Sequence, residues 1–280
     1  MKLSLVIPGL IAAAAAAGTL AAQESDSAVL HAPDASADGH LAPIVLAAAI
    51  AGDPAARRPL ARLRSPLCLT LAANDEAFGR TVAERITDNA RRAGVPIARA
   101  GCRPNALVTF SQNAAEQIAA RRTEGHKFFR GIKESEIDAV LAGRGPAYVF
   151  HAVQPTPRTG EGEAVFADGL QPFWTKENSY LRTPQDLVTT LVVIEAGAVA
   201  GLGPAQIADY VTLRLLAPTG EVAPAGERPA ATILSLFAAP DKAPAQMTPT
   251  DRAYLESLYK LPRTAFASEV LEETVKIAAR

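Results

Sequence analysis

The sequence contains few of the features that usually indicate a function. Only two of its 280 residues are cysteines, 5% are aromatic, and the formal net charge is -1. Two cysteines are too few for a disulfide-framework protein, and the balanced charge gives no bulk attraction to nucleic acid or to an anionic membrane. A hydrophobic content of 49% excludes a disordered chain. We therefore expect a folded protein with no nucleic-acid partner.

Common catalytic motifs are also missing. The sequence has no Gly-x-Ser-x-Gly nucleophile elbow, no Walker loop and no Gly-x-Gly-x-x-Gly fingerprint. None of its four histidines has a second His or a Cys at the spacing that places two metal ligands on one helix face. We accordingly predict no cofactor and no metal site.

The N-terminal segment has the layout of a secretory signal. Residues 1–22 combine a lysine after Met1, an apolar run and a zone of small residues suited to cleavage. An uncleaved membrane anchor is the alternative, but the run is alanine-rich and short for a span. We predict a signal peptide at 1–22, a periplasmic or secreted protein, and no stable membrane insertion after cleavage.

Export bears directly on the two cysteines. Extracytoplasmic compartments oxidise thiols, so an even number of cysteines in an exported chain favours pairing. We predict a disulfide between Cys68 and Cys102. A pair of unlinked buried thiols is the alternative.

Hydrophobic periodicity predicts an α+β fold, with an N-terminal α/β sandwich and a mainly helical C-terminal part. Residues 23–60 are rich in Ala, Asp, Pro and Ser, and we expect a flexible leader there. The two subdomains are predicted at 61–182 and 183–280. Strands are predicted at 67–71, 105–110 and 147–153, and helices at 75–93, 114–122, 134–141, 187–202, 204–216, from 248 onward and at 265–279.

The helix expected at 187–202 is central to the functional argument. The residues Thr183-Pro184-Gln185-Asp186 before it combine an N-cap candidate, a proline suited to the first helical position and an acid suited to the first turn. The nearly continuous apolar content that follows predicts a buried core helix.

This segment resembles the metzincin signature H-E-x-x-H-x-x-G-x-x-H with its metal ligands replaced. Glu195 falls at the position of the general base, and Gly201 falls where the chain turns after the helix. The three histidine positions of the signature are occupied by Ile194, Ala198 and Pro204.

Three other segments extend the resemblance. Residues 232–235 resemble the Met-turn, and residues 247–259 resemble the helix that follows it in matrixin-like peptidases. Residues 101–110 resemble exported, uncharacterised proteins of alphaproteobacterial type. The resemblance implies a zincin-like two-part domain. If it is accidental, 187–202 is simply a hydrophobic core helix.

The departures from the signature determine the predicted function. Side chains of Ile, Ala and Pro have no lone pair for a zinc ion, so they cannot form a catalytic zinc site. We predict an exported, non-catalytic protein that binds a peptide or an envelope partner in a cleft around Glu195, Asp209 and Tyr210. One alternative is an exported hydrolase that uses Glu195 with Asp209 as paired carboxylates, or His151. Another is an assembly or stress-related factor that acts through surface contacts.

Overall fold

A five-stranded sheet organises the part of the chain that the structure describes. The computed structural model describes residues 41–280 except 53, 56, 144, 156–182 and 221–231. All of these residues belong to one compact unit, 35–280. The predicted signal peptide and residues 23–40 of the predicted leader lie outside the described residues. None of the helices in the described part is long and apolar enough to cross a membrane.

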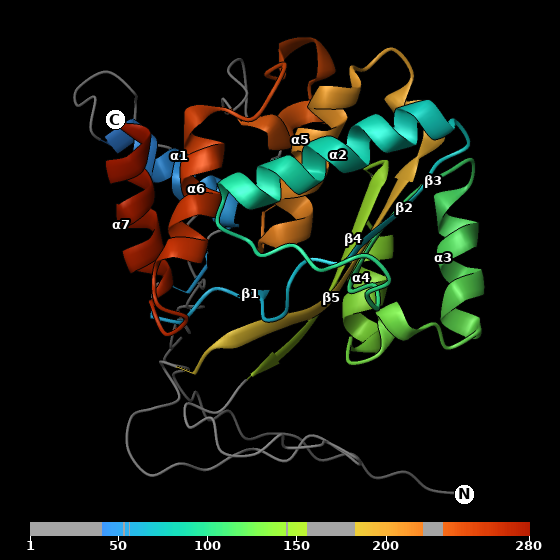
Figure 1. Ribbon diagram of the computed structural model, residues 1–280, viewed down its shortest axis with the longest axis horizontal. Coiled ribbons are helices and arrows are strands. Elements are labelled where there is room, and N and C mark those ends of the chain that lie inside the picture. Colours follow the sequence, from blue (N-terminus) through green and yellow to red (C-terminus); the bar gives the residue numbers. More distant parts are fainter. Residues whose placement is uncertain (1–40, 53, 56, 144, 156–182, 221–231) are drawn as a thin grey trace, which may run out of the picture. The chain divides into compact units, whose positions relative to one another are not determined.

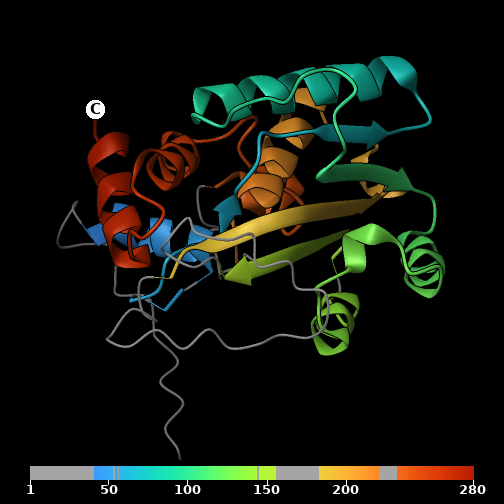
Figure 2. The same ribbon diagram turned by 60° about the horizontal axis from the view of Figure 1, so that its bottom comes forward.

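The central strand of the sheet is β5, Gln185–Glu195. One edge of β5 pairs antiparallel with β4, Ala147–Pro155, and the other pairs in parallel with β1, Arg62–Leu63, and then with β3, Ala106–Ser111. Strand β2, Leu69–Ala72, pairs in parallel with β3 and is the last strand on that side. Figure 2 shows the resulting order β2, β3, β5, β4. All three predicted strands are confirmed.

Strand β5 replaces the helix predicted at 187–202, so that prediction is wrong. Six of the seven residues from 188 to 194 are β-branched, and such side chains favour a strand over a helix. Because β5 has strands on both edges and helices on both faces, it is apolar on both sides and lacks the alternation typical of a half-exposed strand. The apolar run alone therefore could not distinguish strand from helix.

The zinc-peptidase resemblance requires positions 194 and 198 to lie on one helix. Ile194 instead lies in β5, and Ala198 lies in the 3-10 turn η3, Ala196–Val199. Pro204 begins the next helix, α5, Pro204–Leu216. The three signature positions thus belong to three different elements. The structure shows a mixed α/β fold with seven helices in its described part and a mainly parallel sheet.

Helices cover both faces of the sheet. Helices α2, Glu76–Arg92, and α5 pack on the face that receives Val108 of β3. The opposite face receives Leu107, the next residue of the same strand. Successive side chains of a strand point to opposite faces, so β3 and β5 contribute to two separate cores. The second core is covered by α3, Ala114–Thr123, by the short turn η1, Lys127–Phe129, and by α4, Glu134–Leu141.

Side chains cap the N-termini of two of the predicted helices. The Asp75 carboxylate caps α2, and Gly94, with φ of +85°, follows its end. Thr248 and Asp251 cap each other's backbone at the start of α6, Pro249–Lys260. The 3-10 turns between α5 and α6 are η4, Ile233–Leu236, and η5, Pro240–Lys242.

Helices α1, α6 and α7 lie together at one end of the sheet (Figure 1). Helix α7 spans Ala267–Ala278, and α1 spans Leu41–Ala51. The flexible leader predicted at 23–60 is therefore corrected over the eleven residues of α1. Ala47 and Ile50 are fully buried, because this alanine-rich segment both favours a helix and packs against α6 and α7.

The end of α1 approaches the chain that follows α5. The Gly220 N–H donates to the carbonyl of Ile50 at 3.0 Å. A Cβ atom on Gly220 would lie 2.5 Å from the Cα of Gly52, which is closer than carbon atoms approach without displacement. Glycine is therefore the residue that fits this crossing.

The predicted boundary between the subdomains adjoins residues outside the described part. Residues 156–182 precede it, and β5 is the first element after it. Because β5 lies between β3 and β4, both predicted subdomains contribute strands to the same sheet.

Candidate functional site

The predicted disulfide between Cys68 and Cys102 is confirmed. The two Cα atoms lie 6.1 Å apart, and no free cysteine is present. The bond fastens the residue before β2 to the loop that leads into β3. Asn105 strengthens the same junction, because its side-chain oxygen accepts from the Cys68 N–H at 2.9 Å.

Glu195 lies at the carboxyl end of β5 and caps a helix. Its Oε1 atom accepts a hydrogen bond from the backbone N–H of Ala114 at 2.9 Å, and Ala114 is the first residue of α3. The first N–H groups of a helix have no partner within the helix and carry partial positive charge, so a carboxylate stabilises them. This contact gives Glu195 a structural role between the sheet and α3.

Asp209 lies on α5 and is 1% exposed. Its Oδ1 accepts from Arg85 Nε at 2.6 Å and from Asn89 Nδ2 at 2.7 Å. Its Oδ2 accepts from Arg85 Nη2 at 2.8 Å and from the Met247 N–H at 2.7 Å. Four donor groups, three on α2 and one in the segment before α6, therefore surround one carboxylate. The arrangement joins α2, α5 and the segment before α6.

Tyr210 belongs to the core rather than to a cleft. It is 3% exposed, and its ring forms a T-shaped pair with the ring of Phe237, with centroids 4.8 Å apart. Its hydroxyl oxygen accepts from Arg214 Nε at 3.2 Å. Buried tyrosines usually satisfy their hydroxyl in this way, and the contact anchors Arg214 beside the end of α5.

The candidate catalytic groups do not come together. Glu195 contacts α3 on one face of the sheet, whereas Asp209 contacts α2 on the other. No hydrogen bond or ion pair joins the two carboxylates in the described part. Within the described ranges, no three His, Cys, Asp or Glu side chains are grouped so that they could share a metal ion.

His151 is also engaged within the fold. Its Nε2 lies 2.8 Å from the carbonyl oxygen of Arg214 and donates to it, which fixes the tautomer. The pKa of His151 is lowered to about 4, mainly because the side chain is desolvated by burial. The hydrogen bond to the Arg214 carbonyl opposes this decrease, and the Arg214 guanidinium adds to it. The side chain is therefore neutral at pH 7.

A different feature, the outer edge of β2, is open. On this outer side, segment 96–98 pairs only with Leu67, which precedes β2. The Leu67 N–H donates to Pro96 O at 2.7 Å, and the Ala98 N–H donates to Leu67 O at 2.9 Å. The chain then leaves the sheet. The Cys68 carbonyl faces β3, where it accepts from the Ala106 N–H.

Alternate residues of a parallel strand direct their backbone groups to the same side. The N–H and C=O groups of Leu69 and Leu71 therefore point away from β3, and we call them the β2 edge. In the part of the chain that the structure describes, no strand pairs with this edge. Unpaired strand edges are templates for a further strand.

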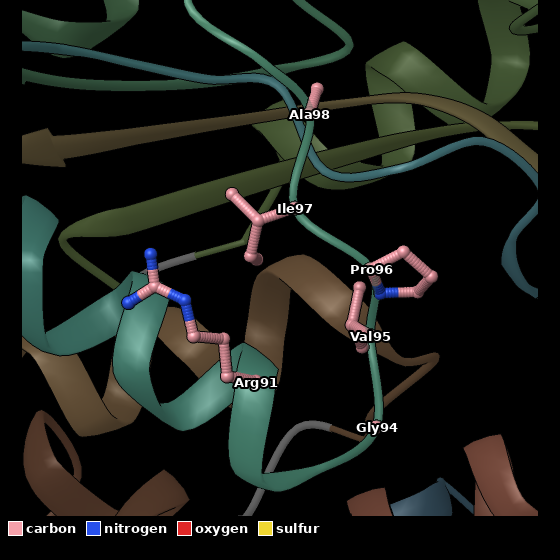
Figure 3. Close-up of a pocket in the computed structure, with 6 residues that line it drawn as sticks. All are labelled: Arg91, Gly94, Val95, Pro96, Ile97 and Ala98. Atoms are coloured by element: carbon pink, nitrogen blue, oxygen red, sulfur yellow. The ribbon is translucent and has the colours of Figure 1, made fainter.

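A groove of about 320 Å³ runs beside the β2 edge. It is lined by residues 67–70 at the start of β2, by Thr87 of α2, and by residues 97–102 and Pro104 of the loop that carries Cys102. A second, more open pocket of about 540 Å³ adjoins it and shares Ile97 and Ala98. Figure 3 shows the latter pocket, with Arg91 of α2 and the Ile97 side chain facing the same space.

The charges along the groove have one sign. Arg99 is the charged residue that lines the groove, and Arg91 is the charged residue that lines the adjoining pocket. Neither lining includes an acidic side chain. Arg91 forms an exposed ion pair with Asp88 at 2.7 Å, one turn earlier on α2. The groove is therefore basic, with an apolar and backbone wall.

Comparisons with known proteins add no relative. Scans against protein-family models, curated proteins and solved structures each found no match to this chain. The candidate site therefore rests on its own geometry. Sequence reasoning did not find the groove, because an open edge depends on the order of strands in the sheet. The local signal was the arginine-rich segment 91–103 between α2 and β3.

Proposed function

We propose that this chain is an exported, non-catalytic protein that binds an extended peptide segment of an envelope partner. The observation that carries the proposal is the unpaired β2 edge beside a groove. An extended segment added to a sheet edge gains main-chain hydrogen bonds, and the adjoining groove selects its side chains. Strand β2 has four residues, so it offers room for a paired segment of about four residues.

Three observations support an exported, non-catalytic role. The Cys68–Cys102 disulfide is of the kind that persists outside the reducing cytoplasm, and residues 1–22 have a signal-like pattern. The carboxylates of Glu195 and Asp209 are engaged by helix capping and by a buried ion pair. The proposal does not require peptidase ancestry, since it rests on the sheet edge and not on the metzincin signature.

The test is a selection from a displayed library of random ten-residue peptides against the oxidised full chain. We expect the wild type to enrich peptides that bind reproducibly. Leu69→Pro removes one outward N–H and adds bulk at the β2 edge while leaving the bonds to β3 in place. Ala98→Trp fills the groove from its loop side. Each variant should bind the enriched peptides at least tenfold more weakly.

The matched control is Ala119→Trp on the exposed side of α3, which should bind as the wild type does. If Leu69→Pro unfolds the protein, Ala98→Trp still tests the groove. The proposal is wrong if the wild type enriches no peptide, or if the folded groove variants bind the enriched peptides as tightly as the control.

A further inference from the structure

The loop beside the β2 edge carries an unusual concentration of positive charge. Residues 91–103 contain four arginines and no acidic residue. All four arginines, Arg91, Arg92, Arg99 and Arg103, are exposed. Only Arg91 has an acidic partner in the described part, and that partner is the exposed Asp88. The remaining guanidinium groups are available to a ligand.

Arg99 and Arg103 are held in place relative to the groove. The Cys102 N–H donates to the Arg99 carbonyl at 3.2 Å, which closes a turn. Cys102 is bonded to Cys68, the residue before β2, and the Asn105 amide donates to Pro66 O at 3.0 Å. A loop that is fastened at several points loses little conformational entropy when a ligand binds.

Arg99 lies near one end of the β2 edge. It follows Ala98, the last residue that pairs on the outer side of the sheet at this point. A segment paired along Leu69 and Leu71 would continue the line of residues 96–98. One end of that segment would therefore lie next to Arg99, where the chain turns away from the sheet.

We propose that the bound segment is acidic, with carboxylates that meet Arg99 and Arg103 at the end of the β2 edge. This inference rests on the proposed function and names the chemistry of the partner. Arginine pairs with carboxylates through two parallel hydrogen bonds, which adds direction to charge attraction. Because the arginines are exposed, the attraction is screened by salt.

The test uses the peptide selection on the oxidised full chain and reads the sequences that it enriches. We expect Asp and Glu to be enriched at one end of the peptides. Synthetic copies in which those acids are replaced by Asn and Gln should bind about tenfold more weakly at low ionic strength. At 1 M salt the acidic peptides and their amide copies should bind with similar affinity.

A double charge reversal, Arg99→Glu with Arg103→Glu, should abolish the preference and enrich Lys and Arg instead. The matched control is Arg57→Glu with Arg58→Glu, which changes the net charge equally on two other exposed arginines. This control should still select acidic peptides.

The outcomes separate the two proposals. Enrichment of peptides without an acidic bias, with binding still lost in Ala98→Trp, would overturn the acidic partner and leave strand addition intact. An equal loss of preference in the Arg57/Arg58 control would also overturn it, because the effect would then come from net charge. Failure to enrich any peptide would overturn strand addition itself.

Discussion

Replacing Asp209 by asparagine should destabilise the fold strongly. The carboxylate accepts four hydrogen bonds, two from Arg85 and one each from Asn89 and the Met247 N–H. Asparagine has nearly the same shape but only one acceptor oxygen. In either orientation of the amide, its NH₂ group faces two of the four donors, so two bonds are lost and donors oppose donors.

The magnitude follows from burial. Removing one partner of a buried ion pair typically costs about 3–5 kcal/mol, because the other charge remains without a counter-charge. Asp209 is 1% exposed, but the Arg85 side chain is 31% exposed and regains some water. We therefore expect the free energy of unfolding to fall by about 3 kcal/mol, at the lower end of that range.

The assay is urea unfolding followed by far-UV circular dichroism at pH 7, with the disulfide intact. The matched control is Glu76→Gln on α2, which removes an exposed pair with Arg80 and should leave the free energy of unfolding unchanged within error. A loss below about 1 kcal/mol for Asp209→Asn would refute the structural role. A gain in stability would point instead to a strained functional acid.

Three further predictions concern other contacts. Replacing Cys68 and Cys102 by serine should lower the free energy of unfolding by about 3–4 kcal/mol, from a sequence separation of 34, in urea titrations with and without reductant. Because the pKa of His151 falls from 6.5 to about 4 on folding, stability present above pH 6.5 should be lost as pH falls toward 4. The full shift corresponds to about 3 kcal/mol. Because the residue is only half-buried, we expect about 1–2 kcal/mol of it, and His151→Gln should remove this contribution from the pH profile of unfolding. Gly220→Ala should lower the thermal midpoint through overpacking worth about 1–3 kcal/mol, whereas Gly145→Ala, with open space around it, should not.

Much of the fold was predictable where sequence patterns are local. The stripe at Phe78, Val82, Ile86 and Ala90 predicts α2, because one face of a helix recurs every three to four residues. The capping residues and the strand before α2 also follow from short-range rules. Strand β5 did not, since a strand buried on both faces has the same continuous apolar run as a buried helix.

The candidate site was harder to predict than the fold. The partners of Asp209 on α2 lie about 120 residues away in sequence. No local sequence pattern could therefore predict that Asp209 forms a buried ion pair. The metzincin signature places Glu195 at the position of the general base, whereas its carboxylate caps the N-terminus of α3. The disulfide was predictable from its chemistry. The β2 edge was not, because it depends on which strand is last in the sheet.

Amide hydrogen exchange at Leu69 and Leu71 tests strand addition most directly. Their N–H groups point away from β3, so they should exchange faster than the inward-facing N–H of Thr70 in the free protein. With a selected peptide at saturation, we predict that both become protected, while exchange at α7 does not change. Saturating binding that leaves the exchange of Leu69 and Leu71 unaltered would contradict the account.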